Sequence, residues 1–255
     1  MSPATLFDLH GQTALVTGAT QGLGWAIAQA LAAHGARLLV SDRDAGACAR
    51  AAAALQDRGH TAVPLPADLA NAAQVTALCA QAGAVDVLVC NAGIQGPAGP
   101  LAAATDTDWQ QVLDINLRAA ARLSSGLIPA MAARGRGSVV LMSSIAGLRG
   151  NGAIGLYGLS KAAIAQLARN LAVEWGPSGV RVNAVSPGLV RTPLAAGLLA
   201  DEDFMQRRLQ ATPLRRVGEP DEIAGVVVML ASAAGGFTTG QNLVVDGGTT
   251  ISDGS

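Results

Sequence analysis

Short apolar runs alternate along this chain with longer segments that have the periodicity of a helix. Residues 13–17 (TALVT) and 37–41 (RLLVS) predict buried strands, and residues 23–33 between them repeat apolar positions with a helical period. Strands and helices that alternate in this way predict a parallel sheet with helices on both faces, joined by right-handed crossovers.

The same alternation continues to the carboxyl end. Further strands are expected at residues 61–65, 85–90, 138–143, 180–185 and 242–246, and further helices at residues 45–57, 71–82, 106–131, 157–175 and 219–232. Residues 194–211 read as a mobile, partly helical insertion. The pattern therefore predicts one doubly wound α/β domain over residues 1–255, although the length alone would also permit two domains.

Composition narrows the class of protein. Apolar residues make up 50% of the chain and charged residues 14%, which favours close helix-on-sheet packing over disorder. A net charge of -1 gives no nucleic-acid footprint. No apolar run reaches the roughly 18 residues of a membrane span, and the polar start Met1-Ser2-Pro3 does not resemble a signal peptide. We therefore expect a cytoplasmic protein without nucleic-acid or membrane partners.

Cysteine and histidine give no sign of a metal site. Cys48, Cys79 and Cys90 are odd in number and lack the spacing of metal ligands, and the three histidines are scattered. We expect the thiols to be reduced and to fill space in the core, and we expect no bound metal.

A glycine-rich turn joins the first expected strand to the first expected helix. Gly18, Gly22 and Gly24 follow a G-x3-G-x-G spacing. Glycines permit a tight bend, a close approach of the backbone to a ligand and close packing of helix on strand. The N–H groups at the start of the helix then suit a pyrophosphate. A turn without a ligand is the alternative for this cluster taken alone.

Asp42 follows the second expected strand, 24 residues after Gly18. A carboxylate at this position can accept hydrogen bonds from the adenosine ribose, and it would repel a 2′-phosphate about 4 Å away by up to about 4 kcal/mol. This favours NAD over NADP. Arg43 weakens this preference, because a guanidinium can hold the 2′-phosphate of NADP or lie over the adenine. A capping or turn role is the alternative for Asp42.

Tyr157 is the only tyrosine, and it precedes Lys161 by four residues. On a helix these positions share one face, so the phenol and the ammonium point into the same space. The ammonium would favour the phenolate over a phenol whose usual pKa is about 10. A packed ring beside a solvated charge is the alternative. Asn116 falls inside an expected helix, where an amide usually faces water.

Six motifs in this order resemble the short-chain dehydrogenase/reductase family over nearly the whole chain. They are the glycine turn after Thr17, Asn91-Ala92-Gly93, Asn116, Ser144, Tyr157-x-x-x-Lys161, and Pro187-Gly188 with Thr192. Ser144 precedes Tyr157 by 13 residues, the separation expected in the family. Cys90 replaces a usual asparagine, and Gln21 occupies a position that is often basic in NADP-using members.

The resemblance implies a seven-stranded Rossmann sheet of order 3-2-1-4-5-6-7, with the site at the carboxyl edge. Ser144 would hydrogen-bond the substrate oxygen and Tyr157 would exchange its proton. Lys161 would bind the nicotinamide ribose and favour the phenolate, and Asn116 would hold a water that connects Lys161 to solvent. The cofactor set implied is Gly18, Gln21, Gly22, Leu23, Gly24, Asp42, Arg43, Asp68, Leu69, Asn91, Ala92, Gly93, Tyr157, Lys161, Pro187, Gly188, Val190 and Thr192.

The sequence thus predicts an NAD(H)-dependent enzyme that transfers a hydride between the nicotinamide and a secondary alcohol or ketone. Residues 194–211 are expected to act as a lid over the substrate. Family members are mostly homotetramers, which predicts the same here. The residues expected to line the substrate pocket are Gln95, Ser144, Ala146, Asn151 and Leu189.

Two other functions fit parts of the pattern. A 3-oxoacyl-(acyl carrier protein) reductase shares all the motifs and usually takes NADPH. Arg134 and Arg136 are then candidates for docking the acidic carrier, while Ser178 stands where such reductases often have a second basic residue. A dinucleotide sensor without catalysis would need the glycine turn but not Ser144 or Tyr157.

Overall fold

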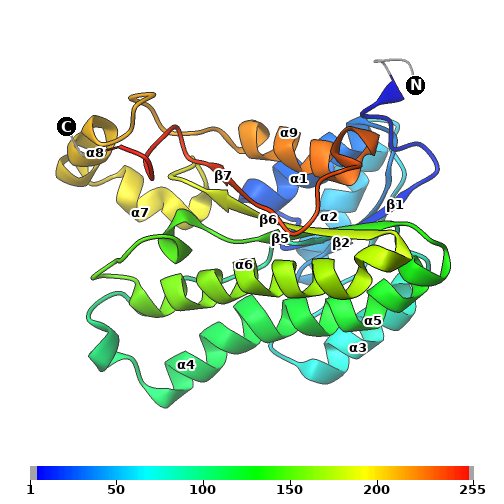
Figure 1. Cartoon of the computed structure of the whole chain (residues 1–255), viewed down its shortest axis with the longest axis horizontal. Helices are drawn as coiled ribbons and strands as arrows, with labels where there is room; N and C mark the ends of the chain where they lie inside the picture. Colours follow the sequence, from blue (N-terminus) through cyan, green and yellow to red (C-terminus); the bar gives the residue numbers. More distant parts are fainter. Residues whose placement is uncertain (1–4, 253–255) are drawn as a thin grey trace.

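The fold is a single parallel sheet with helices on both faces (Figure 1). A computed structural model describes residues 5–252, so the start Met1-Ser2-Pro3 lies outside the described residues. The strand order is β3-β2-β1-β4-β5-β6-β7, which confirms the order implied by the resemblance. Within residues 5–252 the strands are β1 (Thr13–Thr17), β2 (Arg37–Ser41), β3 (Ala62–Pro64), β4 (Val87–Cys90), β5 (Gly137–Met142), β6 (Val180–Pro187) and β7 (Asn242–Val245).

The helices divide between the two faces of the sheet. Their bounds are α1 (Gly22–Ala33), α2 (Ala45–Gln56), α3 (Ala72–Ala82), α4 (Asp106–Leu113), α5 (Ala119–Ala133), α6 (Gly155–Trp175), α7 (Ala196–Leu199), α8 (Glu202–Gln210) and α9 (Pro220–Ala231). Buried side chains of α1, α2 and α9 pack on one face, and those of α3, α5 and α6 pack on the other. This is the doubly wound arrangement that the sequence pattern predicts.

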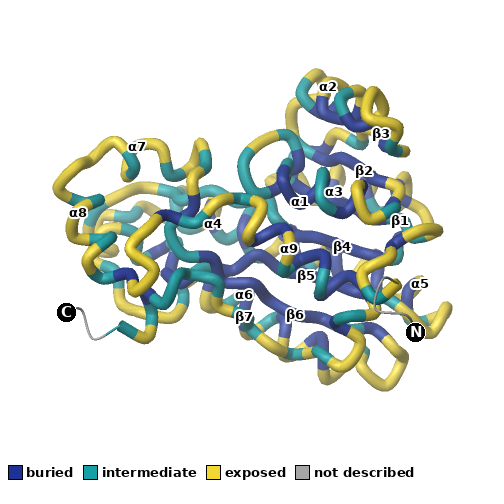
Figure 2. The backbone as a smooth tube through the Cα atoms, turned by 90° about the horizontal axis from the view of Figure 1, so that it is seen from above, coloured by how far each residue is buried: buried dark blue, intermediate teal, exposed yellow. Residues whose placement is uncertain are grey.

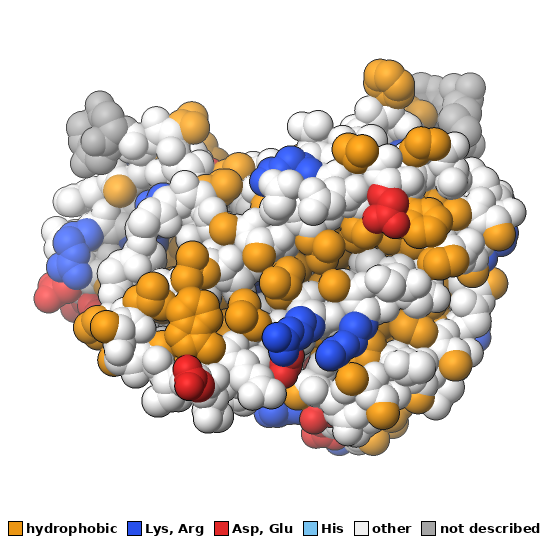
Figure 3. Space-filling model, turned by 60° about the horizontal axis from the view of Figure 1, so that its bottom comes forward, with side chains coloured by type: hydrophobic (Ala, Val, Ile, Leu, Met, Phe, Trp, Pro, Cys, Tyr) orange, Lys and Arg blue, Asp and Glu red, His pale blue; other side chains and the backbone are white. Residues whose placement is uncertain are grey.

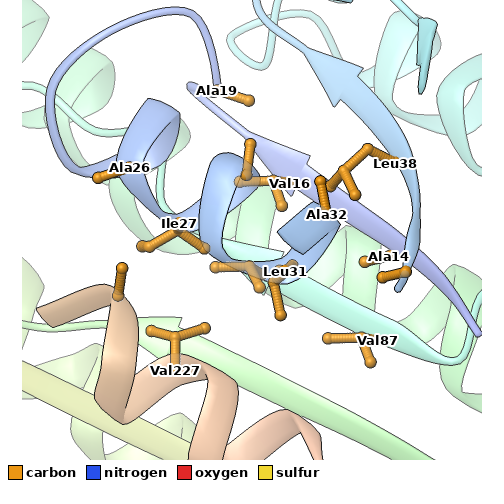
Figure 4. Packing of buried hydrophobic residues seen from close by; sticks show 14 of the residues in the cluster. Ala14, Val16, Ala19, Ala26, Ile27, Leu31, Ala32, Leu38, Val87 and Val227 are labelled. Atoms are coloured by element: carbon orange, nitrogen blue, oxygen red, sulfur yellow. The ribbon is translucent and has the colours of Figure 1, made fainter. Parts of the chain in front are cut away.

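The core forms two layers because successive strand residues point to opposite faces. On β1, Val16 belongs to the layer under α1 and α9, where it lies with Ile27, Leu31 and Val227 (Figure 4), whereas its neighbour Leu15 belongs to the other layer. Burial on both faces explains why the strands read as continuous apolar runs in the sequence.

The single helix expected at residues 106–131 is interrupted. Thr105 caps α4 as expected, but a π-helical turn, η3 (Asp114–Arg118), separates α4 from α5. Asn116 is only 3% exposed, so its amide faces inward, as its role in the family resemblance implies, and not toward water as an amide inside a helix usually does. The wider turn contains the residue whose amide bonds inward, and π-helical turns are frequent at functional sites.

Residues 194–211 form short helices at the carboxyl edge of the sheet. After the 3-10 turn η6 (Pro193–Ala195) come α7 and α8, and Asp201 caps α8 by accepting a hydrogen bond from Phe204 N at 2.9 Å. The expectation of partly helical structure is confirmed. Figure 2 shows these helices as a largely exposed end of the molecule. In the part of the chain that the structure describes, no helix is both long and apolar enough to span a bilayer.

Candidate active site

Two adjoining cavities lie where β1, β2, β4, β5 and β6 end. The larger, of about 450 Å³, has Asp42 after β2 among its lining residues as well as Tyr157 and Lys161 on α6. The smaller, of about 150 Å³, is lined by Ser144 and also by Tyr157. The phenol therefore stands at the boundary between the two spaces, with Lys161 on one side and Ser144 on the other.

The glycine turn brings backbone against backbone at one end of the larger cavity. Gly18 has a φ of +62°, and a Cβ there would lie 2.9 Å from the Ala92 Cα and from Asn91 Nδ2. Asn91 Nδ2 donates to the carbonyl oxygens of Thr17 and Gly18 at 3.0 and 3.1 Å. A Cβ on Gly24 would overlap the Gly18 carbonyl oxygen. Asn91 thus fixes the turn rather than facing the cavity freely, and Gly24 serves close packing.

The start of α1 presents free donors to this cavity. Its N-cap, Gln21, makes no side-chain capping bond, so the first N–H groups of the helix lack a side-chain acceptor. Ser41 Oγ, at the end of β2, is buried and has no hydrogen-bond partner within residues 5–252, and Ser41 lines the same cavity. Unfilled backbone donors and an orphaned hydroxyl fit the pyrophosphate and ribose of a dinucleotide.

Asp42 is tied to the glycine turn. Its Oδ2 accepts a hydrogen bond from Thr20 Oγ1 at 2.8 Å, and its Oδ1 accepts one from Arg43 N at 2.7 Å. Asp44, not Asp42, caps α2, by accepting from Ala47 N at 2.9 Å. An ionised carboxylate has about four acceptor positions, so both oxygens of Asp42 can accept further bonds from a ribose.

Tyr157 and Lys161 face the same space, as the i, i+4 spacing predicts. Lys161 Nζ lies 5.5 Å from the centroid of the Tyr157 ring and donates to the Met142 carbonyl oxygen at 2.7 Å. Ser143 Oγ donates to the carbonyl of Lys161 at 2.7 Å, which ties α6 to the end of β5. The carboxyl end of β5 therefore holds the acid/base pair in place.

Burial moves the proton equilibria of both groups toward their neutral forms. Burial lowers the pKa of Lys161 to about 8. Burial also raises the pKa of Tyr157, with the Ser144 side chain acting weakly in the opposite direction. The expectation from the Tyr–Lys pairing alone was a lowered phenol pKa. In this structure desolvation of the ring dominates, so the pKa of the Tyr157 phenol is raised instead.

Asn116 lies beside Lys161 and bonds the loop after β4. Asn116 Oδ1 accepts from Ile94 N at 2.8 Å, and its Nδ2 donates to Ile94 O at 2.9 Å and to Ser160 Oγ at 3.0 Å. A Cβ on Gly93 would lie 3.1 Å from Asn116 Oδ1 and 3.4 Å from Lys161 Nζ. The amide is therefore close to the lysine, and it links the loop after β4 to α6.

The structure brings most of the predicted residues together. Of the predicted cofactor set, Gly24, Gly188 and Val190 do not line the larger cavity; Gly188 and Val190 line the smaller one. Thr192 and Pro193 lie against Gly22, since a Cβ there would be 3.5 and 3.4 Å from them. The five predicted substrate-pocket residues all line the smaller cavity.

Sequence reasoning missed several lining residues. In the larger cavity they are Thr17, Ser41, Ala67, Ile94, Ile115, Met142, Ser143 and Pro193. In the smaller cavity Arg149 was not predicted, whereas Arg208 belongs to residues 194–211, the segment expected to cover the substrate. Strand-end residues such as Ser41 follow from the parallel sheet itself, because all its strands end at one edge. Arg149 and Arg208 carry no local signal, since they come together only in the folded chain.

Other candidate groups lie away from this edge. Arg134 and Arg136 contact Asp86 at 3.4 and 3.6 Å, just before β4 and β5 begin. They therefore lie at the end of the sheet opposite the site, which contradicts their expected place at its mouth. Cys48 and Cys90 are buried, with pKa values raised by burial to about 11 and 12, so their thiols are protonated fillers as expected. A further cavity of about 510 Å³ contains none of the predicted site residues.

No clustered metal ligands are found in the described range. Within residues 5–252 no group of three or more His, Cys, Asp or Glu side chains is arranged to hold a metal ion.

Comparisons with known proteins match nearly the whole chain. Residues 18–250 match the family model described as enoyl-(acyl carrier protein) reductase. The chain is 37% identical over 244 residues to dehydrogenase/reductase SDR family member 4 of Oryctolagus cuniculus, covering 94% of each chain. It is 40% identical over 257 residues to galactitol 2-dehydrogenase (L-tagatose-forming) of Cereibacter sphaeroides, covering 98% of this chain and 100% of that protein.

A solved structure shows the same fold along its whole length. A gluconate 5-dehydrogenase from Burkholderia cenocepacia, in complex with NADP and tartrate, superposes with a TM-score of 0.93 and 34% identity. The match covers 97% of this chain and 98% of that one.

Proposed function

The chain belongs to the short-chain dehydrogenase/reductase family, and we propose that it is an NAD(H)-dependent enzyme that interconverts a secondary alcohol and a ketone. Its membership makes it an oxidoreductase; the cofactor and the substrate class are the proposal. The observation that carries it is the position of Tyr157, which lines both the larger and the smaller cavity. A phenol at that boundary can exchange a proton with a substrate oxygen beside a bound dinucleotide.

Each polar group around the smaller cavity has one task in this mechanism. Ser144 hydrogen-bonds the substrate oxygen and orients it toward the phenol. In alcohol oxidation Tyr157 takes the hydroxyl proton, and in ketone reduction it returns that proton to the forming alkoxide. Lys161 supplies positive charge beside the ring. A bound nicotinamide supplies the hydride acceptor in oxidation and the hydride donor in reduction.

The tyrosine is the first residue to test. Replacing it in Tyr157→Phe removes one hydroxyl group, so NAD binding should be retained while kcat falls by about 10²- to 10⁴-fold. The measurement is turnover of a ketone panel with NADH, together with NAD affinity by calorimetry. Arg169→Gln, exposed on the same helix, is the matched control and should keep full activity. Comparable turnover in Tyr157→Phe would contradict the mechanism.

The choice of NAD over NADP rests on Asp42. Its carboxylate lines the larger cavity at the end of β2 and is held there by Thr20, so a 2′-phosphate would meet a fixed negative charge. Arg43 lines the same cavity and supports the opposite choice, as does the relative solved with NADP. We expect kcat/KM to be higher with NADH than with NADPH, and Asp42→Ser to narrow that ratio. A clear preference of the unaltered enzyme for NADPH would refute this assignment.

The two other functions have less support. The guanidinium groups considered for docking an acyl carrier protein, those of Arg134 and Arg136, bind Asp86 at the far end of the sheet. A sensor without catalysis would leave unexplained why Ser144, Tyr157 and Lys161 gather at one cavity boundary. If no alcohol or ketone of a broad panel were turned over with either cofactor while NAD still bound, the sensor function would replace our proposal.

A further inference from the structure

Two arginines line the smaller cavity, the space that the proposed function assigns to the substrate. Arg149 follows the 3-10 turn η4 (Ile145–Gly147), and Arg208 comes from α8, about sixty residues further along the chain. Within the described residues, neither guanidinium makes an ion pair with a carboxylate. By contrast, Arg118, Arg134 and Arg191 each make one. Two guanidinium groups without an ion-pair partner thus line the same cavity as Ser144 and Tyr157.

Among the described residues that line this cavity, the charged side chains are both positive. No aspartate or glutamate is among the described residues that line it, in contrast to the larger cavity, which has Asp42 and Asp68. Burial lowers the pKa of Arg208, and the nearby charge of Arg149 lowers it further. Two like charges therefore lie close enough to repel each other, a cost that an anion between them would remove.

One carboxylate outside the cavity lining acts on one of these arginines. Asp246 acts on Arg208 in the opposite direction, but its carboxylate accepts hydrogen bonds from Gly248 N at 2.8 Å and from Thr250 N at 2.7 Å. Both oxygens thus bond the backbone of their own turn. Asp246 moderates the positive field without neutralising the pair of arginines.

Arg208 is also held in orientation. It is half-buried, and its guanidinium carbon lies 5.4 Å from the centroid of the Phe204 ring, one helical turn earlier on α8. Such a cation–π contact fixes a planar group that would otherwise be free to rotate. Arginines on a helix surface whose guanidinium contacts only water are usually exposed and mobile. A stacked, half-buried guanidinium in a cavity is better suited to bind a ligand.

We propose that Arg149 and Arg208 bind the carboxylate of the substrate, so that the enzyme acts on small hydroxy acids and the corresponding oxo acids. This inference rests on the proposed function, because Ser144 and Tyr157 would take the substrate's other end, its hydroxyl or carbonyl oxygen. Guanidinium groups match planar carboxylates through paired hydrogen bonds. A volume of about 150 Å³, below the 300–1,000 Å³ typical of drug-sized ligands, favours a short carboxylate over a bulky phosphorylated compound.

The test compares acids with neutral substrates of the same shape. The probes are acetoacetate, 4-oxopentanoate and 5-oxohexanoate, each beside its methyl ester, with dihydroxyacetone phosphate as a phosphorylated ketone. Reduction is followed by loss of NADH absorbance. We expect kcat/KM for the preferred acid to exceed that for its ester by roughly tenfold or more, about 1.4 kcal/mol. An equal or higher value for the ester, or a preference for the phosphorylated ketone, would overturn the carboxylate assignment.

Variants then show which residues cause the preference for the acid over its ester. Arg208→Gln and Arg149→Gln should each raise KM for the acid by roughly tenfold with a smaller change in kcat, and should change KM for the ester much less than KM for the acid. Arg208→Lys should recover part of the loss, because it restores the charge but not the paired hydrogen bonds. Arg207→Gln, on the same helix but outside the cavity lining, is the matched control and should behave as the unaltered enzyme. An acid preference that survives in Arg149→Gln and Arg208→Gln would contradict the proposal.

Failure of this inference is distinct from failure of the proposed function. If esters and simple ketones are reduced but acids are not preferred, the alcohol dehydrogenase function stands and the carboxylate site is wrong. If neither acids nor neutral ketones are reduced, the proposed function itself fails. Calorimetry of the NAD-loaded protein with pentanoate, which cannot react, gives a readout that does not depend on turnover. Heat of binding that is lost in Arg208→Gln supports the site, and an absence of binding to the unaltered protein opposes it.

Discussion

Burial disfavours the charged form of both Tyr157 and Lys161. These charged forms are the phenolate and the ammonium. The pKa of Lys161 falls to about 8, and that of Tyr157 rises above its ordinary value. Alcohol oxidation needs the phenolate, so it is expected to accelerate as pH rises, whereas ketone reduction needs the phenol and slows. Lys161, with a pKa of about 8, loses its positive charge over the same rise in pH, so the pH profile of turnover reports both groups and not one residue.

The free protein offers a direct test at this residue. Tyr157 is the only tyrosine, so the ultraviolet absorbance of phenolate titrates a single group. We expect its midpoint above about pH 10 without cofactor, because burial raises the pKa. Lys161→Met should leave the midpoint nearly unchanged, because Lys161, with a pKa of about 8, has already lost its positive charge at that pH. Circular dichroism must show that the fold persists over the range. A midpoint below pH 10 in the unaltered protein would contradict the dominance of burial.

At the scale of elements, the central strands β1, β2, β4, β5 and β6 could be predicted from the sequence because nearly all their residues are buried. Residues 13–17 and 37–41 were predicted with the bounds of β1 and β2, whereas β6 runs two residues beyond the expected end, to Pro187. Local signals also predicted the N-cap of α4, where Thr105 and Asp108 bond each other reciprocally. Periodicity, caps and turn glycines act over a few residues, which is why the sequence shows them.

Features made by distant parts of the chain could not be predicted in this way. The π-helical turn at Asn116 depends on bonds to Ile94 and Ser160, which lie 22 and 44 residues away in the sequence. The family motifs supplied Tyr157 and Ser144 but not Arg208, because the resemblance covers the reaction and not the substrate. No period or spacing links α8 to the loop after η4.

The α7–α8 segment, residues 194–211, is the element expected to respond to ligand. Leu194, Leu198 and Arg208 line the smaller cavity, yet both leucines are largely exposed. We propose that the segment closes over bound substrate and buries them, as lids do. Trypsin cleavage after Arg207 should therefore slow several-fold when NAD and substrate are both present. Cleavage after the exposed Arg58, beyond α2, serves as the internal control. Equal rates at the segment with and without ligand would count against closure.

At the scale of the whole molecule, apolar side chains remain exposed on α6 and around β7. On α6, Leu159 and Val173 are exposed, the latter by 80%. Beyond α9, Phe237 is fully exposed, and Val244 lies on β7, the edge strand of the sheet. Figure 3 shows apolar side chains spread between isolated charges over the face that carries α4 to α6. A tetramer built from two-fold axes needs at least two distinct self-complementary surfaces.

We therefore expect a homotetramer, with one interface on α6 and another along β7 and the segment holding Phe237. Light scattering should give about four times the 25.5 kDa of one chain. Val173→Asp and Phe237→Asp each place a charge in one interface, so each should yield dimers, and the double variant should yield monomers. Glu174→Gln, exposed beside Val173 on the same helix, is the matched control and should remain tetrameric. A monomeric mass for the unaltered protein would rule out both interfaces at once. If the unaltered protein is a dimer, and only one of the two aspartate variants dissociates it, a single interface remains.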